Sequence, residues 1–100
     1  MVSSINCDSL LLASVRRTTW TAVSQFEGRT VDNRPVYVRL RHGELTVRVG
    51  NPGDDNASAL DQAPVFDGDY GDHHEFDITW SEVERVTGLR CIGLVEDHYQ

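Results

Sequence analysis

Residues 35–50, PVYVRLRHGELTVRVG, alternate apolar and polar side chains on both sides of a His-Gly dipeptide. Alternation with a period of two is typical of strands that bury one face. Histidine tolerates a positive φ and glycine adopts one freely, so His42-Gly43 fits a two-residue turn. The pattern therefore predicts an antiparallel hairpin. Its buried pairs would be Val36 with Val49, Val38 with Val47, and Leu40 with Leu45.

A second periodic segment, ITWSEVERVTGL, has the signals of a short helix. Thr79 is followed three residues later by Glu82, which is the spacing of a capping box. Gly88 stands where a helix commonly ends in the left-handed conformation. We expect a capped helix over residues 80–87. The short apolar stretch that follows, LRCIGLV, predicts a final strand.

The start of the chain carries competing patterns. Residues 8–17, DSLLLASVRR, begin with two capping residues and end with two arginines, which suits the dipole of a helix. The next segment, TTWTAVSQFEG, is rich in the β-branched and aromatic residues of strands. Apolar positions from Leu12 to Phe26 also fit helical spacing, so residues 18–26 are a strand or the continuation of one long helix. Both alternatives predict an N-terminal helix.

Residues 51–77 separate the predicted hairpin from the capped helix. Proline, glycine, asparagine and aspartate are dense at the start of this segment, and glycine and aspartate at its end. A connection of about 25 residues without regular structure is unusual in a compact domain, and it tends to be functional or disordered. Only residues 57–60 suggest a helical turn. We therefore expect a long acidic loop.

Together these segments predict one α+β domain over residues 1–100. The expected sheet is antiparallel, with three to four strands, an N-terminal helix and a short capped helix near the C-terminus. A chain of 100 residues, 39% of them hydrophobic, can bury one modest core. No apolar run approaches the ~20 residues of a membrane helix. A signal peptide is not evident, so we expect a cytoplasmic protein with no membrane partner.

Charge and cysteine content narrow the function. The net charge is −7; residues 1–50 carry +3 and residues 51–100 carry −10, and lysine is absent. Cys7 and Cys91 form no metal-binding or redox spacing, so we expect free thiols, while a disulfide between them stays an open alternative. The catalytic sequence motifs of hydrolases, nucleotide-binding enzymes and metalloproteases are missing. We therefore predict no catalytic residues and no enzyme.

The segment FDGDYGDHHEFD, residues 66–77, is the strongest candidate for a metal site. Counted from Asp67, it lacks the acid at position 5 and the glutamate at position 12 of an EF-hand calcium loop. His73 and His74 are adjacent, whereas zinc ligands on a helix are three or four residues apart. We therefore predict no metal and no other cofactor. A metal-binding module built from residues 67–77 remains an alternative.

The preferred functional prediction is docking on a basic protein surface. Acid-rich surfaces speed association with such partners and can occupy sites meant for phosphates. We predict a non-enzymatic adaptor or inhibitor, of the kind encoded by phages and mobile elements, whose basic partner can itself bind nucleic acid. The predicted partner-binding residues are Asp67, Asp69, Tyr70, Asp72, Glu75 and Asp77.

Direct binding of nucleic acid is the other alternative. The predicted hairpin places Tyr37, Arg39, Arg41 and Arg48 on its exposed face. Aromatic and arginine side chains on a sheet can stack bases and neutralise phosphates. The charge of −7 opposes this at long range. The sequence makes no prediction of the oligomeric state.

Overall fold

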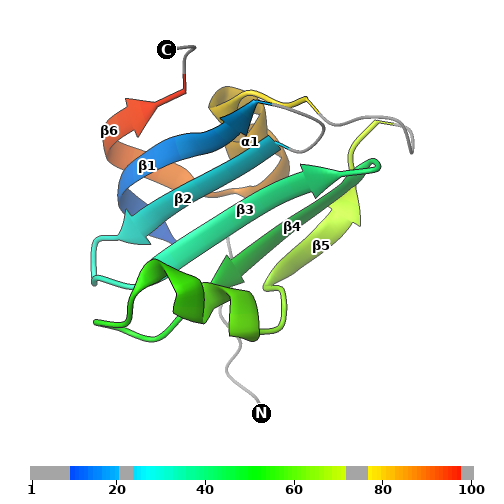
Figure 1. The fold of residues 1–100 in the computed structure, drawn as a ribbon. Coiled ribbons are helices and arrows are strands. Elements are labelled where there is room, and N and C mark those ends of the chain that lie inside the picture. The colour runs from blue at the N-terminus through cyan, green and yellow to red at the C-terminus, as the bar shows by residue number, and fades with distance from the viewer. Residues whose placement is uncertain (1–9, 21–23, 72–76, 98–100) are drawn as a thin grey trace.

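The computed structural model describes residues 10–20, 24–71 and 77–97. These residues form a sheet that dominates the structure, with one 3-10 helix and one α-helix (Figure 1). The strands are β1 (Leu11–Trp20), β2 (Ser24–Thr30), β3 (Pro35–Arg41), β4 (Glu44–Val49), β5 (Phe66–Asp69) and β6 (Arg90–Glu96). The helices are η2 (Asn56–Asp61), which is the 3-10 helix, and α1 (Trp80–Thr87).

The sheet has six strands in the order β5-β4-β3-β2-β1-β6. All neighbours are antiparallel except β6, which runs parallel to β1. The predicted α+β fold with an antiparallel sheet of three to four strands is therefore wrong. The molecule is mostly a mixed sheet, because strands form at two places where the sequence suggested a helix and a loop.

The predicted N-terminal helix is the first correction, since Leu11–Trp20 is strand β1. Leu12 and Val15 are both buried although they are three residues apart. A register shift between Leu12 and Ser14 explains this, because a bulge places two residues opposite one and resets the alternation. Phe26, which completed the helical spacing, belongs to β2. The apolar positions of a bulged strand and of the strand after it thus fell by chance at helical spacing.

The β3–β4 hairpin is confirmed in its predicted register. Leu40 pairs with Leu45 and Val38 with Val47, and Val36 pairs with Val49 further along. His42 and Gly43 have φ angles of 53° and 76°, so both turn residues adopt the left-handed conformation that the tight connection requires.

Helix α1 is also confirmed. The Thr79 hydroxyl accepts a hydrogen bond from the Glu82 backbone N–H at 3.4 Å, and Gly88 ends the helix with a φ of 85°. Ile78 and Val83, on either side of the cap, are both buried and hold the start of the helix against the sheet. The final strand is confirmed as β6, with the parallel pairing as a new feature.

The predicted loop over residues 51–77 contains two regular elements. Helix η2 includes the expected turn at residues 57–60, and the Asp55 side chain caps it by accepting from the Ser58 backbone N–H. Strand β5 pairs with β4. It has only four residues, FDGD, so its own sequence carries almost no strand signal, and the open edge of β4 supplies its partner.

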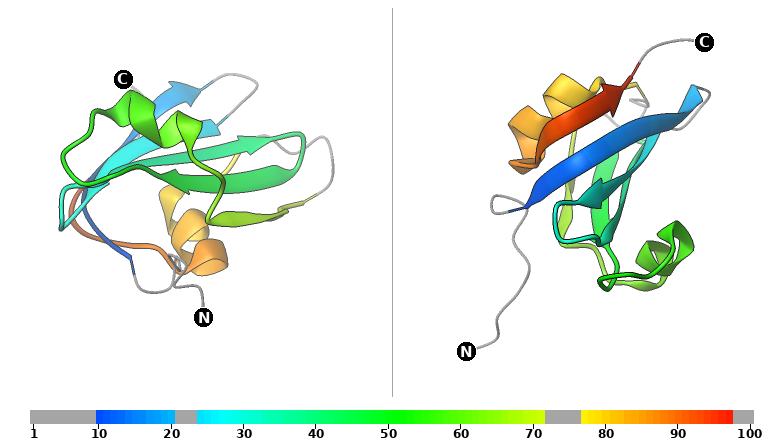
Figure 2. Two further views of the ribbon diagram at one scale, coloured as in Figure 1. Left: turned by 90° about the horizontal axis from the view of Figure 1, so that it is seen from below. Right: turned by 90° about the vertical axis from the view of Figure 1, so that its left-hand side faces the viewer.

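The core lies between the sheet and α1, whereas η2 packs on the opposite face of β3 and β4 (Figure 2). The Phe26 and Trp80 rings meet there with their centroids 5.4 Å apart. Neither helix of the described residues is long and apolar enough to cross a membrane. The buried core residues are Leu12, Val15, Phe26, Val36, Val38, Leu40, Leu45, Val47, Val49, Ile78, Trp80, Val83 and Leu89.

Candidate functional site

Three carboxylates gather where β4 and β5 meet at one edge of the sheet. Asp67 and Asp69 are exposed on β5, and the pairing places Glu44 of β4 opposite Asp69. A hydrogen bond with Asp67 and the charge of Asp67 raise the pKa of Glu44, and the charge of Asp69 adds to this. We call Glu44, Asp67 and Asp69 the acidic edge. Within the ranges that the structure describes, no ion pair joins any of the three to an arginine.

The other predicted partner-binding residues are placed differently. The Tyr70 ring is half-buried against the core, and its hydroxyl donates to Glu82 Oε1 at 3.1 Å. Tyr70 is therefore anchored to α1. Asp77 is exposed just before that helix. Asp72 and Glu75 lie outside the described residues, so the structure brings together only Asp67 and Asp69 of the predicted set.

The metal alternative depends on residues that are only partly described. Asp72, His73 and His74 lie outside the described ranges. Among the residues that are described, no group of three His, Cys, Asp or Glu side chains is arranged to hold a metal ion. The acidic edge by itself thus lacks the geometry of such a site, and the expected absence of a metal stays a prediction.

Beside the acidic edge, arginine side chains line a hollow of about 150 Å³ on the outer face of the hairpin. The Arg39 Nε atom is buried and has no hydrogen-bond partner among the described residues. Arg48 donates from Nη1 to the Gln62 carbonyl oxygen. A guanidinium cluster of this kind can bind a carboxylate or a phosphate. We call this site the arginine hollow; it is lined by Arg39, Arg41, Glu44, Thr46 and Arg48.

Tyr37 shares the outer face with these arginines but is not open to a ligand. Tyr37 is only 9% exposed, and η2 packs over its strand, β3. The Tyr37 hydroxyl oxygen accepts a hydrogen bond from Gln25 Nε2. Burial raises the pKa of the Tyr37 hydroxyl, with a further contribution from the charge of Glu27. Of the predicted nucleic-acid face, the structure therefore presents the arginines and covers the aromatic ring.

A buried ion pair that the sequence analysis missed joins both ends of the fold. Arg17 Nε lies 2.5 Å from Asp97 Oδ1, and the Arg17 side chain is 2% exposed. Arg17 also donates to the Ser24 hydroxyl and to the Ile78 carbonyl oxygen. Asp97 Oδ2 accepts from the Trp80 backbone N–H at 2.7 Å, so the pair connects β1, β2, α1 and the end of β6. The sequence held one sign of this pair: in a strand, Arg17 lies two residues after Val15 and therefore on the same, buried face.

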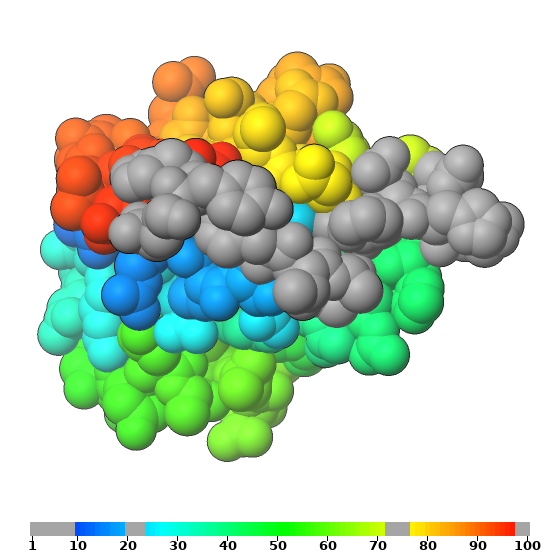
Figure 3. All heavy atoms as spheres, turned by 45° about the horizontal axis from the view of Figure 1, so that its top comes forward, coloured from blue at the N-terminus to red at the C-terminus, as the bar shows by residue number. Residues whose placement is uncertain are grey.

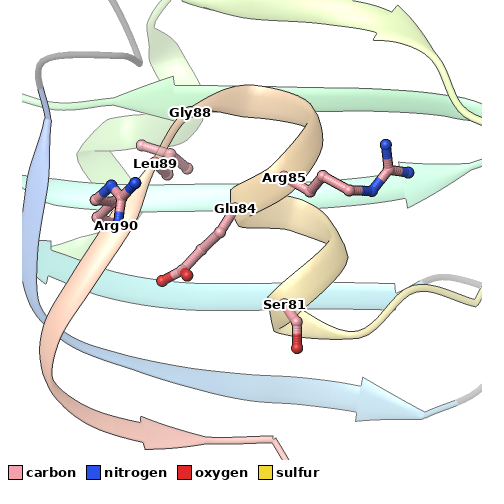
Figure 4. Close-up of a pocket in the computed structure, with 6 residues that line it drawn as sticks. All are labelled: Ser81, Glu84, Arg85, Gly88, Leu89 and Arg90. Atoms are coloured by element: carbon pink, nitrogen blue, oxygen red, sulfur yellow. The ribbon is translucent and has the colours of Figure 1, made fainter.

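A hollow of about 550 Å³ lies between α1 and the start of β6 (Figure 4). Glu84 Oε2 accepts from Trp80 Nε1 and from the Cys91 backbone N–H, both at 2.9 Å. Arg85 projects away from Glu84 and pairs with Glu82 at 2.7 Å. That pairing, together with the Tyr70 hydroxyl, lowers the pKa of Glu82 to about 2. Glu84 thus links α1 to the start of β6.

The two surface features best suited to a partner are neighbours on the hairpin and its edge strand. The acidic edge offers three crowded carboxylates, and the arginine hollow, which shares Glu44 with it, offers three guanidinium groups. The confirmed register of β3 and β4 positions the arginine hollow, and the pairing of β4 with β5 positions the acidic edge. Comparison of the chain with protein-family models, curated proteins and solved structures gives no match.

Proposed function

We propose that this chain is a non-enzymatic interaction protein that docks on a basic protein surface through the acidic edge. The observation that carries the proposal is the crowding of Glu44, Asp67 and Asp69, which raises the pKa of Glu44 without an ion pair to an arginine of the described residues. Such carboxylates gain from an external cation, because each positive charge relieves their mutual repulsion.

The position of β5 supports this role. It is an outermost strand of the described sheet, so one side of its backbone has no partner strand there, and its two aspartates are exposed. Residues 51–100 carry −10, which attracts a basic partner at long range and speeds its association. An adaptor or inhibitor for a basic protein, including one that itself binds nucleic acid, fits these properties. A cytoplasmic location is part of the same proposal.

A capture experiment with a matched control tests it. Asp67→Asn/Asp69→Asn removes two charges from the acidic edge, and Asp54→Asn/Asp61→Asn removes two charges elsewhere. We expect immobilised wild type and the control to retain the same basic proteins from a lysate, and the edge variant to lose them. Equal retention by all three chains would refute the assignment to this edge. Equal loss by both variants would show that binding depends on the total charge of the protein and not on the acidic edge.

A second candidate function is supported by the buried, unpartnered Arg39 Nε atom in the arginine hollow. Three guanidinium groups there can bind the phosphates of a single-stranded nucleic acid, without the base stacking that the covered Tyr37 ring would provide. Affinity for an oligonucleotide should then fall steeply with salt. Arg39→Ala/Arg41→Ala should weaken it, whereas Arg85→Ala, on α1, should not. No binding at low salt removes this candidate.

A further inference from the structure

The edge of the sheet opposite to the acidic edge is strand β6. It is seven residues long and, among the residues that the structure describes, it pairs on one side only, with β1. The right-hand view of Figure 2 looks onto this edge, and the space-filling view shows β6 at the margin of the molecule (Figure 3). A free edge presents unpaired backbone N–H and C=O groups to any strand of suitable shape.

Large apolar side chains are exposed along this edge. Ile92 is 67% exposed, Leu94 is 62% exposed and Val95 is 39% exposed, and Leu11 on the neighbouring β1 is 41% exposed. These make up four of the six large hydrophobic residues that are exposed in the described ranges. An apolar patch concentrated on one edge strand is typical of an interaction surface.

The two edges of the sheet differ in the way natural proteins protect a free strand. Short length and charged side chains prevent edge-to-edge pairing, and β5 has both, with four residues and two aspartates. In β6 the charges stand only at the two ends, Arg90 and Glu96. Between Cys91 and Leu94, β6 advances three residues against two of β1, and a side chain at Gly93 would overlap the Ala13 carbonyl oxygen.

The charges of β6 are complementary to those of a second β6 in antiparallel orientation. When Gly93 of one copy lies opposite Gly93 of the other, Arg90 of each copy lies opposite Glu96 of the second copy. The same register places Ile92 opposite Leu94, and Cys91 opposite Val95. A parallel arrangement would bring Arg90 against Arg90 and Glu96 against Glu96, which is unfavourable. The strand thus favours its own antiparallel copy.

Beside the strand, the α1 side of the edge is hollow. A depression of about 500 Å³ is lined by Trp80, Cys91 and Val95 together with Thr79, Ser81, Glu84 and Asp97. A second β6 would bring its own Cys91 and Val95 to this side, so the depression provides room for those side chains. The opposite side of the contact would cover Ile92 and Leu94 of both copies.

We propose that two copies of this chain associate through antiparallel pairing of β6, forming one continuous sheet. The pairing leaves β5 at both outer ends, so each copy keeps its acidic edge open. The proposal is independent of the basic partner: it rests on the length, exposure and charge order of β6.

Sedimentation equilibrium of the full chain over a range of concentrations tests the pairing. We expect a dimer, and we expect Leu94→Lys to raise its Kd by at least about tenfold, because it places a cation in the apolar contact. Leu60→Lys is the matched control, since Leu60 is a 52% exposed residue on η2, which packs on β3 and β4, and it should leave Kd unchanged. A wild type that is monomeric at all concentrations overturns the proposal, as does a dimer that tolerates Leu94→Lys.

A charge-exchange experiment tests the orientation. Arg90→Glu places like charges opposite each other in its homodimer, and Glu96→Arg does the same with the other sign. Each variant alone should be a weaker dimer than wild type, while an equimolar mixture should form a heterodimer because the charges are again complementary. Circular dichroism checks that both variants are folded. Failure of the mixture to dimerise would exclude the antiparallel register.

Discussion

At the scale of single residues, the fold depends on polar groups that a hydrophobic pattern does not reveal. The Arg17 guanidinium lies 4.6 Å from the centre of the Phe26 ring and is ion-paired with Asp97. A buried charge of this kind is tolerated only while its partner remains. Arg17 and Asp97 are 80 positions apart, so the pair holds β1 against the end of β6.

Removing Asp97 should therefore destabilise the protein strongly. We expect Asp97→Ala to lower the free energy of unfolding by about 3 kcal/mol, because the Arg17 charge stays buried without its carboxylate. Chemical denaturation measures the change. Asp61→Ala, on the exposed end of η2, is the control and should lie within about 0.5 kcal/mol of wild type. Equal midpoints for the two variants would contradict the structural role of the pair.

The low pKa of Glu82 leads to a prediction about pH. Its folded pKa of about 2 is below its ordinary value of 4.5, because Arg85 and Tyr70 donate to the ionised carboxylate. A carboxyl group whose pKa is lower in the folded state stabilises the fold above its unfolded pKa, and this stabilisation is lost as the pH falls towards the folded pKa. Glu82→Gln should thus flatten the decline in unfolding free energy between about pH 4.5 and 2. Urea denaturation over this range checks it; parallel curves for the two proteins would exclude the effect.

At the scale of elements, local sequence signals succeed where the element stabilises itself. The hairpin carries its turn residues and both alternating strands, and α1 carries both caps. Strand β5 has no comparable turn, cap or alternation signal of its own, and it depends on pairing with β4. The same dependence explains why Asp67 and Asp69 were assigned to a loop, although they belong to a strand.

The cap of α1 can be tested by a single substitution. Thr79→Ala should lower the free energy of unfolding by about 1 kcal/mol, because the Glu82 backbone N–H loses its acceptor. Ser81→Ala, an exposed position inside the same helix, serves as the comparison and should have a much smaller effect. If the two denaturation midpoints shift equally, the Thr79 hydroxyl is not the stabilising group.

At the scale of the whole molecule, stability should decrease from the centre of the sheet towards its edges. Strands β2, β3 and β4 are paired on both sides and carry most of the fully buried side chains. Strand β5 is short and β6 is exposed, so both open at lower free energy in a monomer. This arrangement places both proposed contact surfaces on the least protected strands.

Amide hydrogen exchange of a dilute sample measures this order. We expect the slowest exchange in β3 and the fastest strand exchange in β5 and β6, because each of these two strands pairs with one neighbouring strand only in the described part of the chain. At higher concentration, exchange in β6 should slow if two copies pair there, while β5 should serve as the unchanged internal control. Uniform protection across all strands would contradict the expected gradient.

The sequence by itself determined the hairpin with its register, the capped helix, the final strand and the excess of acids in the second half. Each of these depends on neighbours within a few residues, where turn, cap and alternation signals act. Tertiary structure alone decided that residues 11–20 are a bulged strand, because the buried Leu12 and Val15 become a consistent face only against β2 and α1. It also decided that β5 forms, that β6 runs parallel to β1, and that Arg17 meets Asp97. The acidic residues were visible from the start, but their convergence with Glu44 at one edge requires strands β4 and β5 to pair, and pairing between distant segments leaves no periodic trace in either one.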